Sequence, residues 1–247
     1  MANYSVTITM PETTAVWMHE QGFQLYAFKA VQVGGGGGKP LVWFASDIYS
    51  VNTEFVWEVV YQAYSSQSAI VPGGRIQASA SYPADLGQKF TITSPAGTGT
   101  VTRDGLEGTI MITSTVLDRE FACGISQKRD GKFAPLCALP LDYGLTDLFT
   151  PVEKVLLMFS TAAKDLGTVV VQAFSDGVFI TLTGTEPNRQ VSYEKGKGWS
   201  WGGGSWATPV SAGADLVRLL IEPSRKLELA RMDASPLLAA VAGEDRG

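Results

Sequence analysis

Hydrophobic and polar side chains alternate with a period of two along several stretches of the chain. Phe55, Trp57 and Val59 fall on one face of an extended segment, whereas Glu58 and Gln62 fall on the other. Because successive side chains of a β-strand point to opposite faces, this period predicts strands rather than helices. The alternating stretches are rich in Val, Ile, Thr and aromatic residues, which suit a pleated, half-buried surface.

Turn chemistry supports the same interpretation. Asp-Gly pairs at residues 104–105, 130–131 and 176–177 are each flanked by strand-like segments. A type I′ hairpin turn needs positive φ at both central residues, which Asp-Gly supplies at little cost. Strands are expected near residues 4–10, 23–33, 40–46, 53–65, 74–82, 88–94, 107–116, 119–127, 131–139, 152–160, 167–174, 177–183 and 189–194.

These signals predict an all-β fold with little helix: an antiparallel β-sandwich, or two packed β modules with hairpin connectivity. The 247 residues fit either arrangement. Residues 1–222 are expected to form the β-sandwich core and residues 223–247 a C-terminal extension. If there are two modules, their boundary is expected near residues 143–151.

Helix is expected in few places. Residues 13–20 are predicted to form a short helical turn, and residues 235–242 a short helix. Before the second of these helices, residues 215–222 and 226–232 have the pattern of a hairpin about Pro223-Ser224.

Charge and composition narrow the classes of partner. The net charge of −5 argues against nucleic acid, because phosphate binding needs clustered Lys and Arg. No stretch approaches the roughly 18 unbroken apolar residues of a membrane-spanning helix. Residues 1–10 lack the basic and apolar regions of a secretory signal. The sequence predicts a soluble cytoplasmic protein, with release by lysis or a non-classical route as the way out of the cell.

The chain has few of the cysteine and histidine residues that bind transition metals. A zinc site needs about four ligands, and the chain has only two cysteines and one histidine. Cys123 and Cys137 are expected to be buried thiols, with a disulfide between neighbouring strands as the alternative. His19 is expected to be a surface or half-packed residue. No metal ion and no cofactor are predicted.

Two glycine-containing segments resemble catalytic motifs but do not satisfy them. The run Gly34–Gly38 precedes Lys39, yet Val33 and Pro40 occupy positions where a phosphate-binding loop needs Gly and Ser or Thr. We expect a mobile hairpin loop there instead, because glycine loses the most chain entropy on ordering. Ser205 lies one residue short of a nucleophile elbow and lacks its strand–turn–helix context.

The segment VSYEKGKGWSWGGGSW is the most unusual in the chain. Trp199, Trp201 and Trp206 all fall inside a single stretch of eight residues, and this stretch belongs to a glycine-rich loop. Their flat faces suit stacking on sugar rings or insertion among lipid headgroups. The alternative is that they plug one end of the β core. The first hypothesis is therefore a non-enzymatic, lectin-type protein that recognises glycans or a glycosylated surface, with Tyr193 and Arg189 supplying polar contacts.

Residues 89–116 suggest a second hypothesis. Ser and Thr alternate there with apolar residues around Gly97–Gly99, as in a transmembrane β-hairpin. An ordinary two-sided sheet has the same pattern. The hypothesis is a soluble β-pore-forming toxin that forms a homo-oligomer on a membrane surface and inserts this hairpin.

Carboxylates carry a third hypothesis, a cofactor-independent isomerase, cyclase or hydrolase with an apolar pocket. Asp118 and Glu120 would share a strand face, whereas Asp85, Asp142 and Asp147 lie in expected loops. Glycoside hydrolysis needs two carboxyl groups roughly 5–10 Å apart. Catalytic residues stay unassigned, and the scarcity of catalytic motifs favours a non-enzyme.

Overall fold

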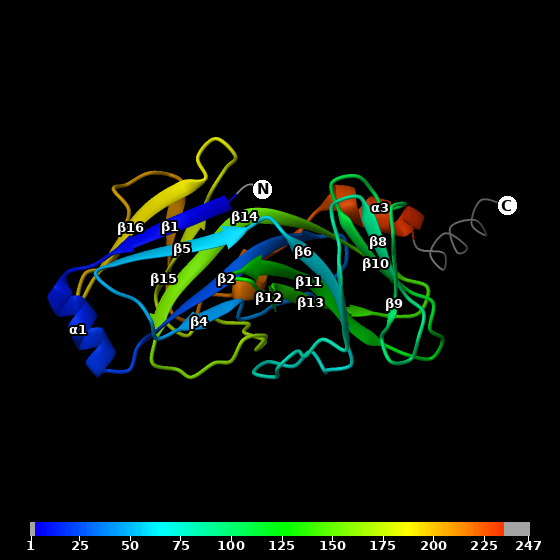
Figure 1. Ribbon diagram of the computed structural model, residues 1–247, viewed down its shortest axis with the longest axis horizontal. Coiled ribbons are helices and arrows are strands. Elements are labelled where there is room, and N and C mark those ends of the chain that lie inside the picture. The colour runs from blue at the N-terminus through cyan, green and yellow to red at the C-terminus, as the bar shows by residue number, and fades with distance from the viewer. Residues whose placement is uncertain (1–2, 235–247) are drawn as a thin grey trace.

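Two long apolar strands lie at the centre of the protein. The computed structural model, which describes residues 3–234, pairs β2 (Gln24–Val33) antiparallel with β14 (Thr146–Ser160). Both strands run through the middle of an elongated molecule (Figure 1). The all-β prediction is confirmed, since about 50% of the residues lie in strands and 10% in helices.

Within residues 3–234, the strands form three sheets. The central sheet contains, in order, β18 (Ala207–Val210), β15 (Gly177–Thr181), β14, β10 (Ile110–Ser114), β8 (Gln88–Ile92) and β9 (Gly99–Thr102), and β2 adds β4 (Phe44–Ser46) and β19 (Ile221–Pro223) to it. The N-terminal sheet has the order β17 (Gly198–Ser200), β16 (Asn188–Glu194), β1 (Asn3–Thr9) and β5 (Asn52–Glu58). The third sheet has the order β3 (Lys39–Pro40), β13 (Cys137–Leu141), β11 (Phe121–Arg129), β6 (Tyr61–Ser66) and β7 (Ala80–Pro83), with β12 (Lys132–Pro135) beside β11.

The main core is built from all three sheets. It includes Val6 of the N-terminal sheet, Phe149 of the central sheet and Ile125 of the third sheet. Helix α1 (Glu12–Glu20) lies at one end of the molecule and packs Ala15 and Met18 against this core (Figure 1). The predicted helical turn at residues 13–20 is thus confirmed.

Most expected strands are present, but several have different bounds. The stretch 53–65 is two strands, β5 and β6, in different sheets, although Phe55, Trp57, Tyr61 and Ala63 are all buried. The stretches 40–46 and 131–139 also divide in two, and only the end of 74–82 is a strand, β7. Residues 167–174 make isolated bridges instead of a strand. Burial follows the alternation, but alternation does not show where a strand changes sheet.

One of the three Asp-Gly turns is confirmed. Asp130 and Gly131 have φ of 48° and 75° and join β11 to β12 in an antiparallel hairpin, as a type I′ turn requires. The other two predictions are wrong. Asp104-Gly105 lies between β9 and β10, which do not pair with each other, and Gly177 is the first residue of β15.

The tail differs from the expected hairpin about Pro223-Ser224. It contains α2 (Leu216–Leu220), the short strand β19 and α3 (Arg225–Ala234). Asp215 caps α2, since its Oδ1 accepts a hydrogen bond from the Arg218 backbone N–H. The helix expected at 235–242 lies outside the described residues, and the division into a core and a C-terminal extension stays a prediction.

The glycine run at residues 34–38 is not a hairpin loop. It connects β2 of the central sheet to β3 of the third sheet, so the flanking strands do not pair. A Cβ at Gly34 would lie 2.7 Å from the Leu227 carbonyl oxygen, and one at Gly35 would lie 2.3 Å from Asp147 Oδ1. The glycines therefore permit close approach to α3 and β14, which the expectation of a mobile loop missed.

The segment 89–116 is not a single hairpin either. β8 and β9 pair antiparallel, but β10 lies parallel to β8 and pairs on its other side with β14. All five residues of β10 are buried. Within residues 3–234, no helix is both long and apolar enough to cross a membrane.

Candidate functional site

The predicted tryptophan site lies where the N-terminal sheet meets the edge of the central sheet. Arg189 and Tyr193 come from β16, Trp199 from β17, and Trp201 and Trp206 from the connection to β18. We call these five residues the tryptophan surface. All five are partly buried, and their aromatic members pack against the main core.

Trp199 and Tyr193 form one half of this surface. They are paired across β16 and β17, with ring centroids 5.1 Å apart. Trp199 also stacks on Phe159, with centroids 5.2 Å apart and planes inclined by 11°. Its indole N–H donates to the Asp176 carbonyl oxygen at 3.4 Å. Burial raises the pKa of Tyr193, and nearby Asp176 raises it further, so this hydroxyl stays neutral.

Trp206 and Arg189 form a second pair. The Arg189 guanidinium lies over the Trp206 ring, 4.8 Å from its centroid, and is bound to the Glu186 carboxylate. Arg189 Nε is buried and has no hydrogen-bond partner among the described residues. A Cβ at Gly204 would lie 2.2 Å from Trp206 Nε1, so this glycine lets the backbone pass close to the indole.

The tryptophans of this surface differ in burial from those of the core. Trp43 and Trp57 are 2% and 1% exposed, whereas the three surface tryptophans are only partly buried. Trp201 is nevertheless fixed, since its indole N–H donates to the Gly204 carbonyl oxygen at 2.9 Å. The three rings are therefore neither buried in the core nor carried on an unconstrained loop. They are held in place while part of each remains accessible.

A buried ion pair, which is not among the candidate residues predicted from the sequence, lies between β2 and β14. Lys29 Nζ is 2.6 Å from Glu153 Oε2, and the side chains are 0% and 14% exposed. The Trp57 indole N–H donates to the same oxygen at 2.8 Å, and the Tyr61 hydroxyl to Oε1 at 3.3 Å. Lys29 Nζ also lies 5.8 Å and 4.7 Å from the ring centroids of Trp43 and Trp57.

Burial is the largest influence on the pKa values of Lys29 and Tyr61 in this cluster. It lowers the pKa of Lys29, although the Glu153 charge acts in the opposite direction. It also raises the pKa of Tyr61, and the charge of Glu153 raises it further. The sequence signal was a lysine within the apolar run of residues 25–33, on the strand face of Leu25 and Ala27.

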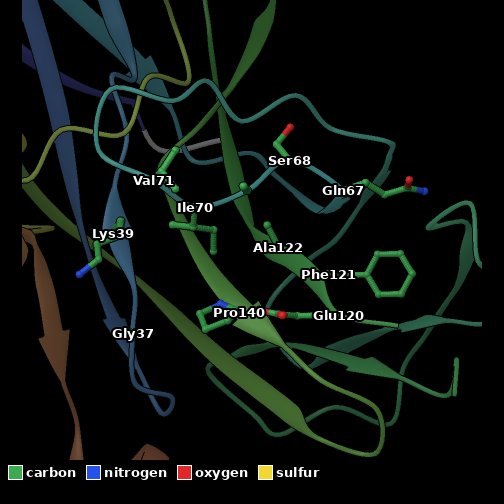
Figure 2. Close-up of a pocket in the computed structure, with 11 residues that line it drawn as sticks. Gly37, Lys39, Gln67, Ser68, Ile70, Val71, Glu120, Phe121, Ala122 and Pro140 are labelled. Carbon is green, nitrogen blue, oxygen red and sulfur yellow. The ribbon is translucent and has the colours of Figure 1, made fainter. Parts of the chain in front are cut away.

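An open groove of about 440 Å³ lies in the third sheet (Figure 2). Ile70, Val71 and Pro140 contribute to its apolar lining, and Lys39 and Glu120 contribute opposite charges. Glu120 was one of the candidate carboxylates, and it is exposed. The groove brings no second candidate carboxylate beside Glu120, so it contains no acid–base pair of carboxyl groups.

Asp147 is buried rather than exposed in a loop. It is 1% exposed within β14, and its Oδ1 accepts a hydrogen bond from Arg231 Nε at 2.9 Å. Burial raises its pKa to about 6, although Arg231 opposes the shift. The other candidate carboxylates Asp85, Asp118 and Asp142 are exposed.

The remaining candidates have structural surroundings. Cys123 and Cys137 are buried and free, as predicted, and burial raises the pKa of both thiols. His19 is exposed and stacks on Tyr49, with ring centroids 4.3 Å apart. Residues 3–234 contain no group of three or more His, Cys, Asp or Glu side chains that could hold a metal ion.

Comparison with protein-family models, with curated proteins and with solved structures gave no match.

Proposed function

We propose that this protein is a non-enzymatic, lectin-type carbohydrate-binding protein and that its ligand binds on the tryptophan surface. The observation that carries the proposal is the Arg189 guanidinium, ion-paired with Glu186 and placed over a partly buried indole, Trp206. An aromatic ring offers a flat apolar face to a sugar ring. The adjoining ion pair supplies charged donors and acceptors, which form the stronger hydrogen bonds, for the sugar hydroxyls.

Rigidity supports the same proposal. The indole N–H groups of Trp199 and Trp201 are bound to backbone carbonyls, and Trp206 is held between Arg189 and the Gly204 backbone. A platform that is already ordered loses little entropy when a ligand binds. Glu186, three residues before Arg189, joins the predicted residues as a polar contact.

A glycan array probed with the labelled full chain tests the proposal, followed by titration of the best ligand. We expect Arg189→Lys to weaken binding about tenfold or more, roughly 1.4 kcal/mol, because lysine cannot keep the planar contact with Trp206. Arg75→Lys is the matched control, since Arg75 pairs with Asp165 away from any tryptophan contact. An array without binding, or equal losses in both variants, would refute the proposal.

The other two hypotheses receive no specific support. Membrane insertion of residues 89–116 would require β10 to leave both β8 and β14. Two enclosed carboxylates, 1% and 14% exposed, are already engaged, Asp147 by Arg231 and Glu153 by Lys29, Trp57 and Tyr61. Neither is left free for a substrate, so we do not propose a hydrolase or isomerase.

A further inference from the structure

We propose that Lys29 and Glu153 react to form an intramolecular amide bond, which covalently joins β2 to β14. The juxtaposition that carries this inference is an amine and a carboxyl group 2.6 Å apart, enclosed by Trp43, Trp57 and Tyr61. The proposal is independent of glycan binding and concerns a modification of the core.

A local irregularity of β14 brings the two groups together. Pro151 lies opposite Val31 and Val155 opposite Lys29, so β14 advances four residues while β2 advances two. Glu153 lies in this bulge. Bulges re-aim side chains and recur next to functional sites, and here the bulge places the Glu153 carboxylate against Lys29 Nζ.

The surroundings favour the uncharged pair that the reaction requires. An ion pair is expensive to keep in a low-dielectric interior, and proton transfer from the ammonium to the carboxylate removes both charges. Lys29 is 0% exposed and lies beside two indole rings, so its amine is strongly desolvated. The direction of its pKa shift, downward by burial, agrees with a reactive neutral amine.

The bonds and protons balance without any further reactant. Lys29 Nζ attacks Cδ of Glu153, a C–N bond forms, and the bond from Cδ to Oε1 breaks. That oxygen leaves as water with two protons that came from the lysine ammonium. The products are a neutral secondary amide and one water molecule, and no oxidant or activated co-substrate is consumed.

Two hydrogen-bond donors contact the Glu153 carboxylate, one at each oxygen, and each can assist one part of the reaction. The Trp57 N–H, 2.8 Å from Oε2, can hold the oxygen that becomes the amide carbonyl and stabilise its developing negative charge. The Tyr61 hydroxyl, 3.3 Å from Oε1, can pass a proton to the departing oxygen and regain one from the amine. The 14% exposure of Glu153 gives the released water a route to solvent.

A second lysine–glutamate pair in the chain provides a comparison for Lys29 and Glu153. Lys154 Nζ lies 2.6 Å from Glu222 Oε1, the same separation, but these side chains are 32% and 21% exposed. Solvent stabilises both charges of that pair. Lys154 and Glu222 should therefore remain an ion pair, whereas Lys29 and Glu153 condense.

Mass spectrometry of the denatured full chain tests the proposal. We expect an intact mass lower than that of the sequence by one water molecule. A tryptic digest should contain a branched peptide that joins the Lys29 and Glu153 segments, with no cleavage after Lys29. A full-length chain of unshifted mass that is cleaved normally after Lys29 would overturn the inference.

Two variants assign the site. Lys29→Met should restore the unshifted mass, whereas Lys154→Met should still lose one water. Loss of water that persists in Lys29→Met, or that maps to another pair of peptides, would overturn the proposal. If Lys29→Met does not fold, the branched peptide from the unaltered chain still decides the question.

Discussion

Lys29 and Asp147 show at the residue scale how enclosure changes the chemistry of a charged side chain. They are 0% and 1% exposed, and each meets one opposite charge, Glu153 or Arg231. Burial lowers the pKa of Lys29 and raises that of Asp147, in each case against the effect of the partner. Alternation could place Lys29 on a buried face, but Glu153 lies 124 residues away and no local pattern connects the two.

Asp147 gives a prediction about pH. Its folded-state pKa of about 6 is above the unfolded value of about 3.9, so the fold binds the proton more tightly. The stability contributed by protonated Asp147 is fully present below the unfolded pKa and is lost as pH rises through 6. We expect the free energy of unfolding to fall over this window by about 1.4 kcal/mol per unit of pKa difference.

Urea unfolding of the unaltered chain and of Asp147→Asn at several pH values between those two pKa values checks this expectation. The unfolding free energy of Asp147→Asn should depend less on pH, because the variant has no carboxyl group to titrate at residue 147. Parallel pH profiles for the two proteins would show that Asp147 does not titrate as described.

At the scale of elements, the glycine run shows why a correct local pattern can be misread. A lack of side chains suggested mobility, yet in the fold it permits contact with Leu227 of α3 and Asp147 of β14. The strands themselves were largely predictable, because burial follows the alternation in β5 and β8. The tail was not, since α3 is held by Leu227 and by the Arg231–Asp147 pair, which sequence alone could not identify.

Single alanine substitutions in the run test its packing. A Cβ at Gly35 would lie 2.3 Å from Asp147 Oδ1, whereas one at Gly36 would meet nothing within 4 Å. We expect Gly35→Ala to lower the free energy of unfolding by about 1–3 kcal/mol through overpacking. Gly36→Ala should be nearly neutral or slightly stabilising. Chemical denaturation measures both, and equal stability of the two variants would support the original expectation of a free loop.

At the scale of the whole molecule, sheet assembly depends on contacts between distant parts of the chain. β1 pairs with β5 on one side and with β16 on the other, and this parallel β1–β16 pair joins residues more than 180 positions apart. Turn signals predict only neighbouring hairpins, so the fold class was predictable and the strand order was not. The same limit applies to the site: the tryptophans are visible in the sequence, but Arg189 over Trp206 and Phe159 against Trp199 require the fold.

The affinity of Trp206→Ala for a glycan selected by the unaltered chain tests the central claim most directly, with stability measured on the same sample. The variant should remain folded and unfold cooperatively. Because Trp206 is only partly buried, its free energy of unfolding should fall by less than the roughly 3–5 kcal/mol expected for a fully buried tryptophan such as Trp57. We predict at least a tenfold loss of affinity in the folded variant, about 1.4 kcal/mol. Unchanged affinity, or a loss of binding explained entirely by unfolding, would contradict the proposed role of the tryptophan surface.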